Sequence, residues 1–155
     1  MTVESVRAFL ARHAPDIAIV ETDGSSATVE LAARGHGVQP AQIAKTLSLR
    51  IRERILLIVA SGTAWLNNRK VKDVLGGKPR MLTADEVVVA TGHPVGGVCP
   101  FGLATPLAVY CDLSLKAFDE VVPAAGSTHS ALRISPSRLA ELVKAEWVDV
   151  CDQPG

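Results

Sequence analysis

The segment Ile55–Ala60 constrains the fold more than any other part of the sequence, because ILLIVA is a continuous run of apolar residues. Such runs are typical of strands that are buried on both faces of a sheet. The preceding segment, Thr46–Ile51, alternates instead, with Leu47, Leu49 and Ile51 on one face, which predicts a half-buried strand. The chain is therefore expected to bury part of a β-sheet.

Short helices are predicted between the strands from apolar spacing and end signals. They span the first residues up to Pro15, Ser26–Ala33, Pro40–Ala44, the segment from Asn67 or Asn68 to Gly76, Glu86–Ala90 and Ser135–Lys144. The helix that ends at Gly76 is expected to turn Val71, Val74 and Leu75 inward. A Thr83–Glu86 capping box is expected to begin the helix at Glu86–Ala90. Further strands are predicted at Ile17–Thr22, Leu107–Cys111, Glu120–Ala124, Ala131–Ile134 and Trp147–Val150. This alternation, without repeats or a linker, predicts one α+β domain over residues 1–155.

The apolar runs, the first residues and the cysteines of the sequence indicate where in the cell the protein is expected. No apolar run approaches the roughly 20 residues that a membrane-spanning helix requires, and the start MTVESVRAFLARH lacks the apolar core of a secretion signal. The three cysteines form no C-x-x-C pair, and their odd number argues against a disulfide framework. A cytoplasmic protein without a membrane partner is expected.

The formal net charge is zero, but the charges are unevenly distributed along the chain. Between Lys45 and Arg80 nine basic residues stand against two acidic ones, so this segment carries +7 and the rest of the chain −7. Such segregation is typical of a surface for phosphates or another acidic partner. It is equally compatible with two ordinary solvated faces.

The stretch Thr91–Gly102, TGHPVGGVCPFG, holds four glycines and two prolines in twelve residues. Prolines stiffen a loop, whereas glycines let another backbone or a ligand approach closely. The loop lacks the terminal Lys-Ser/Thr of a P-loop and the G-x-G-x-x-G spacing of a dinucleotide site. Nucleotide hydrolysis is therefore not expected.

Two side chains suggest chemistry, and each has a structural alternative. Lys45 is either an edge lysine with its ammonium in water or a point charge that grips a carbonyl or phosphate oxygen. Cys99 is either a nucleophile with His93 or His129 as its base or a small buried apolar residue. The histidine spacing suggests no metal site.

Three stretches together resemble the YbaK/prolyl-tRNA-synthetase-associated editing domain: AQIAKTLSLR, LTADEVVVATGHPVGGVCPFG and AAGSTHSALRISPSRL. The resemblance runs from about Ser26 to Val150, and it implies a mixed, largely antiparallel, curled sheet (a pseudo-barrel) flanked by short helices. It also implies a free-standing aminoacyl-tRNA deacylase, which hydrolyses the ester joining a wrong amino acid to the tRNA 3′ end. The alternative is a non-catalytic module on the same scaffold that binds the tRNA end or a synthetase.

The resemblance further implies site residues. The family's A-K-T-L lysine is an active-site residue, and Lys45 holds that place here. The family's Gly-x-x-x-Pro core is matched by Gly96 to Pro100, whose backbone amides are expected to hold the ester carbonyl. Catalysis by Lys45, Gly96 and Pro100 would need no metal or cofactor and would be helped by a ribose hydroxyl of the substrate. The implied substrate-binding residues are Thr46, Gly97, Val98, Cys99, Phe101, Gly126 and His129.

The implied partner is the 3′ acceptor end of an aminoacyl-tRNA, of the proline type and carrying Cys, Ala or a similar small amino acid. A synthetase is a second expected partner, and DNA is not expected. The basic side chains expected to meet acceptor-stem phosphates are Arg69, Lys70, Lys72, Lys78 and Arg80. Cys99 stands where serine or proline is expected, which predicts a changed pocket size and sensitivity to oxidation.

Overall fold

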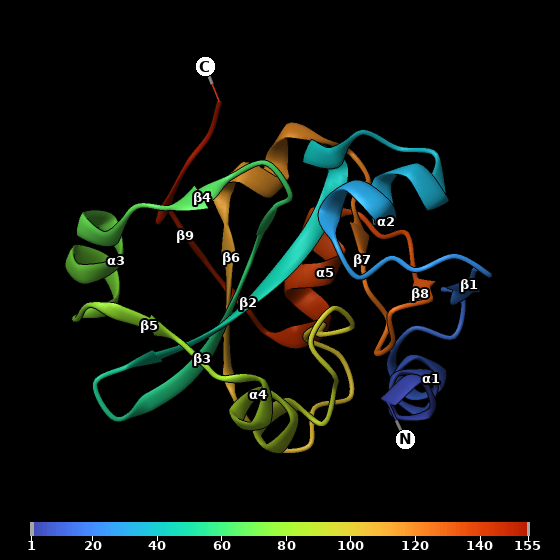
Figure 1. Ribbon diagram of the computed structural model, residues 1–155, viewed down its shortest axis with the longest axis horizontal. Coiled ribbons are helices and arrows are strands. Elements are labelled where there is room, and N and C mark those ends of the chain that lie inside the picture. Colours follow the sequence, from blue (N-terminus) through green and yellow to red (C-terminus); the bar gives the residue numbers. More distant parts are fainter. Residues whose placement is uncertain (1, 155) are drawn as a thin grey trace.

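The computed structural model describes residues 2–154, and a mixed sheet of six strands is its main element in that range (Figure 1). The strands pair in the order β5-β2-β3-β6-β9, and β7 pairs with β2 outside this path. Their bounds are β2 Ile43–Ile51, β3 Arg54–Ser61, β5 Pro79–Met81, β6 Ala108–Asp112, β7 Val122–Pro123 and β9 Glu146–Val148. The ends of the expected domain, residues 1 and 155, lie outside the described part.

The sheet combines both pairing directions. The two longest strands, β2 and β3, form an antiparallel pair from Ala44–Ser61 to Ile51–Arg54, and β5 pairs antiparallel with β2. The strands β6, β7 and β9 pair in parallel with β3, β2 and β6 respectively. The predicted mixed sheet in an α+β fold is therefore confirmed, and the sheet stays open between β5 and β9.

The two faces of the sheet bury different layers. Leu57 and Val59 of β3 pack with α1 (Thr2–His13) and α5 (Pro136–Val143). Their neighbours Leu56 and Ile58 pack on the other face with α3 (Asn68–Leu75). The continuous apolar run is thus buried on both faces because helices cover both sides of the strand.

Helix ends follow the predicted chemistry in part. The capping box of α4 (Ala84–Thr91) is confirmed, since Thr83 and Glu86 bond each other's backbone N–H, and α5 begins behind Ser135 as predicted. The predicted cap Ser26 is wrong, because α2 (Val29–His36) begins behind Thr28. None of the helices in residues 2–154 is long and apolar enough to cross a membrane.

Other predicted elements are displaced or shorter. The helix predicted at Pro40–Ala44 is wrong: a 3₁₀ turn, η1, occupies Pro40–Gln42, and the chain is extended from Ile43 because β2 pairs with β7 there. Val74, predicted to face inward, is 49% exposed. The remaining short elements are β1 Val20–Glu21, paired with β8 Ser130–Ala131, β4 Trp65–Leu66, paired with β10 Cys151–Asp152, and the 3₁₀ turn η2 Leu113–Ala117.

Asp112, at the end of β6, is a buried carboxylate that joins three segments. One oxygen accepts the backbone N–H groups of Val150 and Cys151 at 2.9 and 3.2 Å, and the other accepts that of Ser114 at 2.9 Å. The Ser114 hydroxyl in turn accepts the N–H of Ser61 at 3.0 Å. Asp112 is 2% exposed, so water cannot replace it as an acceptor.

We expect Asp112→Ala to lower the free energy of unfolding by roughly 3–5 kcal/mol, because it leaves three buried N–H donors unsatisfied. Urea unfolding followed by circular dichroism measures this loss. Asp119→Ala, at an exposed position, is the control and is expected to change stability by less than about 0.5 kcal/mol. A loss below about 1 kcal/mol in Asp112→Ala would contradict the assigned role.

Candidate active site

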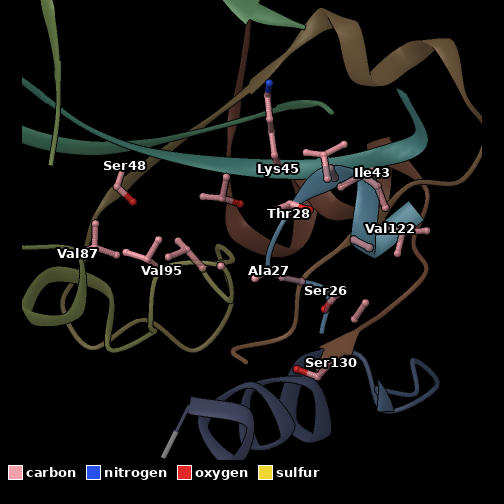
Figure 2. Close-up of a pocket in the computed structure, with 18 of the residues that line it drawn as sticks. Ser26, Ala27, Thr28, Ile43, Lys45, Ser48, Val87, Val95, Val122 and Ser130 are labelled. Carbon is pink, nitrogen blue, oxygen red and sulfur yellow. The ribbon is translucent and has the colours of Figure 1, made fainter. Parts of the chain in front are cut away.

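A cavity of about 240 Å³ opens beside β2, and five segments of the chain form its walls (Figure 2). They are residues 26–29 at the start of α2, the first half of β2, residues 81–87 of β5 and α4, the loop 95–98, and the hairpin of β7 and β8. Half of the wall residues are alanine or valine, and the polar side chains of the wall other than Lys45 carry hydroxyls. Lys45 is the one ionisable residue among the described residues of the wall.

Alternation along β2 provides the floor of this cavity. Ala44, Thr46 and Ser48 lie on the face that lines the cavity, whereas Leu47 and Leu49 pack into the core beneath α3. In the described part of the chain the Thr46 hydroxyl is buried and makes no hydrogen bond. A buried hydroxyl without a partner is costly, so a group that enters the cavity and bonds it would gain binding energy.

Lys45 contributes backbone to the cavity wall, but its side chain points away from the other labelled side chains (Figure 2). Its ammonium donates hydrogen bonds to the carbonyl oxygens of Gly62, at 3.3 Å, and Ala64. Burial lowers the pKa of this ammonium. The Lys45 side chain therefore stabilises the turn after β3 through these two hydrogen bonds.

The glycine loop packs tightly on the hairpin turn. A Cβ on Gly97 would lie 2.7 Å from backbone atoms of Ser127, and Gly96 has the left-handed φ of +90°. The Gly97 amide is used inside the loop, where it donates to the Pro94 carbonyl at 2.9 Å, and the Gly97 carbonyl accepts the N–H of Gly126 at 3.0 Å. The glycines here allow close approach of protein backbone.

Several amides of the same loop have no acceptor within the described residues. Gly96 and Val98 line the cavity, and within the described residues their backbone N–H groups donate to no acceptor. Thr28 and Val29 at the start of α2 also line the cavity. The Thr28 hydroxyl accepts the N–H of Leu31, whereas the N–H groups of Val29 and Glu30 have no acceptor within the described residues, and the helix dipole is positive at this end. The cavity can therefore stabilise negative charge on an oxygen with backbone dipoles.

Cys99 and His93 lie outside the cavity wall and do not form a nucleophile–base pair. His93 Nε2 lies 2.7 Å from the Phe101 carbonyl, so this nitrogen carries the proton and cannot accept one from the Cys99 thiol 3.7 Å away. Burial lowers the pKa of His93 and raises that of Cys99 to about 12. Cys99 and Phe101 are fully buried in the core.

The other expected residues fall into two groups. Lys45, Thr46, Gly96 and Val98 line the cavity; Gly97, Cys99, Pro100, Phe101, Gly126 and His129 lie behind or beside its wall. His129 is exposed, and its Nδ1 donates to the Gly24 carbonyl at 3.0 Å. No group of three or more His, Cys, Asp or Glu side chains that could hold a metal occurs in residues 2–154.

The five basic residues expected to meet phosphates are divided between α3, the segment after it and β5. Arg69, Lys70 and Lys72 belong to α3, whose buried side packs on the sheet face opposite Thr46 and Ser48. Lys70 pairs with Asp149 at 3.0 Å and with Asp152 at 3.3 Å, and Arg80 pairs with Glu86 at 3.5 Å. Lys78 lies between α3 and β5. Arg80 is therefore the member nearest to the wall residues Met81 and Leu82.

Several wall residues were not anticipated from the sequence. Ser26, Thr28, Ser48, Val87 and Ser130 line the cavity, although none of them was among the expected site residues. Ser48 had a readable signal, because it shares its strand face with Thr46 once the alternation of Leu47 and Leu49 is recognised. The others come from distant segments that only the fold brings together.

Comparison with known proteins gives consistent matches of three kinds: a family model, curated relatives and solved structures. The family model of the aminoacyl-tRNA editing domain matches residues 23–142. An uncharacterized Bacillus subtilis protein, YwhH, is 45% identical over 153 residues, which is 97% of this chain and 98% of YwhH. A solved structure of a proposed trans-editing enzyme for prolyl tRNA synthetase superposes with a TM-score of 0.90 at 31% identity, over 99% of this chain and 98% of that one.

A proline–tRNA ligase from Citrifermentans bemidjiense is 35% identical over 115 residues, which is 74% of this chain. This match covers 20% of the ligase, so the chain spans about a fifth of that relative.

We expect the thiol of Cys99 to react very slowly with disulfide reagents in the native protein. With a pKa of about 12, raised by burial, roughly one thiol in ten thousand is ionised at pH 8. A Cys111→Ala/Cys151→Ala variant isolates Cys99, and its absorbance change should be fast in urea and slow in buffer, rising with pH. A native rate near that of a free cysteine would contradict the assigned burial.

Proposed function

Because the chain belongs to the aminoacyl-tRNA editing domain family, we propose that it is a trans-acting editing enzyme for tRNA of the proline type. Membership of this family makes the protein an aminoacyl-tRNA deacylase, an enzyme that hydrolyses the ester between an amino acid and tRNA. The similarity to a proposed trans-editing enzyme and to proline–tRNA ligases supports the choice of tRNA. Action in the cytoplasm beside a synthetase is part of the same proposal.

The observation that carries the proposal is a cavity with unpaired donors and almost no charge. Gly96 and Val98, whose backbone N–H groups have no acceptor within the described residues, line a space that is also lined by the start of α2 and by Thr46, whose buried hydroxyl has no partner there. Attack on an ester builds negative charge on the carbonyl oxygen, and fixed N–H donors stabilise that charge best where water is excluded. We assign the amides of Gly96 and Val98 to the carbonyl oxygen.

The wall chemistry supports a small, uncharged amino acid as the hydrolysed group. Ala32, Ala44 and Val122 make part of the wall apolar, and no described wall residue carries a carboxylate that would attract a basic side chain. We propose that Thr46 and Ser48 supply hydrogen bonds to the bound aminoacyl group or the terminal ribose. A ribose hydroxyl of the substrate is then the group available to help the attacking water, because the wall offers no histidine or carboxylate for that task.

Lys45 keeps a place in this proposal as a positioning residue. Its ammonium donates hydrogen bonds to the carbonyls of Gly62 and Ala64, just after β3. These bonds hold the end of the β2–β3 pair, and Thr46 lies on the opposite face of β2 at this end. Cys99 has no chemical step, because its thiol is buried, protonated and outside the cavity wall.

The proposal is tested with a panel of proline-type tRNAs carrying Ala, Cys, Ser or Pro. We expect hydrolysis above the spontaneous rate for at least one small non-cognate amino acid, and sparing of Pro. Thr46→Val, which removes the unpartnered hydroxyl at nearly constant volume, should lower kcat/KM about tenfold, equivalent to about 1.4 kcal/mol.

Thr22→Val is the matched control, because the Thr22 hydroxyl bonds the Gly24 carbonyl away from the cavity. Its kcat/KM should stay within twofold of the parent. Ester cleavage no faster than the spontaneous rate with every member of the panel, at excess enzyme, would refute the proposed function.

Lys45→Ala should lower both stability and activity, because two carbonyls lose a charged donor. We expect a loss of roughly 1–3 kcal/mol in the free energy of unfolding together with a fall in kcat rather than a rise in KM. Arg12→Ala, which removes an exposed guanidinium from the end of α1, is the control. Unchanged stability with abolished turnover would show instead that the Lys45 ammonium acts on the substrate.

A further inference from the structure

The imidazole of His93 lies at the base of the glycine loop, and we propose that it is a positioning residue that keeps the Gly96 and Val98 amides in place for the ester carbonyl. The His93 side chain is fully buried and lies outside the cavity wall. This inference rests on the proposed function, since it explains how the amides assigned to the carbonyl oxygen are held. His93 contacts neither the substrate nor the reacting atoms.

A hydrogen bond from the His93 ring closes the base of the loop. Nε2 lies 2.7 Å from the Phe101 carbonyl, and because a carbonyl only accepts, Nε2 is the protonated nitrogen. The bond joins residues eight positions apart, so it spans the stretch that carries Gly96 and Val98. Phe101 is itself held in the core, where its ring centroid lies 5.9 Å from that of Phe9.

The backbone of His93 is bonded to α4. The Thr91 hydroxyl accepts the His93 N–H at 3.0 Å and donates to the Val87 carbonyl at 2.7 Å. Val87 is a wall residue of the cavity, and Gly92 ends α4 with a left-handed φ of +78°. His93 therefore links the helix at the cavity wall to the Phe101 segment in the core.

The other strong contacts of the loop hold its first half. The Gly97 amide donates to the Pro94 carbonyl at 2.9 Å, and the Gly97 carbonyl accepts the N–H of Gly126 at 3.0 Å. These two bonds fix the turn that includes Gly96. They do not reach the residues that follow Gly97.

The second half of the loop depends on His93. Between Val98 and Phe101 the described residues make one strong hydrogen bond, which is the one from the imidazole. The Cys99 sulfur lies 3.7 Å from the same carbonyl, and a thiol is a weak donor. Loss of the imidazole N–H would therefore let Val98 move relative to Gly96.

The second ring nitrogen of His93 points to a role beyond stability. Nδ1 is buried and makes no hydrogen bond within residues 2–154. A buried acceptor without a partner costs free energy, and an apolar side chain of similar volume would avoid that cost. Burial also lowers the pKa of His93, which keeps the ring neutral. The bond from Nε2 to the loop accounts for a polar ring at this position.

Two substitutions of similar size test the inference by deacylation of the mischarged tRNA that the panel identifies. His93→Leu removes the donor and should lower kcat about tenfold with KM within twofold of the parent. This loss is smaller than the roughly 10²–10³-fold cost of removing an oxyanion donor, because the amides remain but are less well placed. His93→Gln ends in an amide N–H at about the place of Nε2 and should restore kcat to within about threefold.

Stability separates this role from ordinary core packing. His93→Leu removes the unpaired Nδ1 together with the Nε2–H bond, so its melting temperature should change by less than about 4 °C. Leu139→Ala is the matched control at another fully buried position, on α5. It should lower the melting temperature by more than about 5 °C and leave kcat within twofold while the protein is folded.

NMR detects the same positioning without turnover. The ¹⁵N shifts of the His93 ring should identify Nε2 as the protonated nitrogen of the parent. Backbone order parameters of Gly96 and Val98 should be about 0.85 in the parent and in His93→Gln, and that of Val98 should fall toward about 0.6 in His93→Leu.

The inference is overturned if His93→Leu keeps the parent kcat and order parameters, if His93→Gln is as impaired as His93→Leu, or if Leu139→Ala loses as much kcat. A protonated Nδ1 in the parent would overturn it as well. Where His93→Leu unfolds, His93→Asn takes its place, because the asparagine amide is too short to reach the Phe101 carbonyl. A parent that hydrolyses no member of the panel refutes the proposed function instead, and the order parameters then decide whether His93 holds the loop.

Discussion

The register of β2 between β3 and β5 is the constraint on which the site depends. Side chains alternate along a strand, so Lys45, Leu47 and Leu49 face the α3 core while Thr46 and Ser48 face the cavity. A slip of one residue would exchange the two sets and place leucines in the cavity and hydroxyls in the core. Eight paired positions with β3 and three with β5 hold the strand in its register.

The parts of the fold that could be predicted are those with local chemical signals. The Thr83–Glu86 capping box located α4, the Ser135-Pro136 pair located α5, and the apolar run located β3. The predictions were wrong where the local structure depends on a partner that is distant in sequence. Ile43 is extended because β7 pairs with it, and Ser26 caps no helix because its hydroxyl donates to the Thr128 carbonyl. Neither partner is near in sequence.

The candidate site was only partly accessible for the same reason. Family resemblance drew attention to Lys45 and to the loop from Gly96 to Pro100, and the cavity wall does include Lys45, Thr46, Gly96 and Val98. Sequence could not tell that the Lys45 ammonium points to two carbonyls, or that the Gly97 amide is already used within its loop. Side-chain direction depends on strand register, and amide availability depends on turn geometry.

The hydrogen-bond donors along the cavity face of β2 are uncharged inside the cavity and charged at the outer end of the strand. Inside the cavity, donors are backbone amides and hydroxyls, which cannot be titrated and which act strongly where water is scarce. At the outer end of the same strand face, Arg50 and Arg80 share the Glu86 carboxylate at 3.3 and 3.5 Å. A buried arginine would cost desolvation energy. Because β2 carries both sets of groups on one face, its strand between Thr46 and Arg50 separates the uncharged donors of the cavity from the charged side chains.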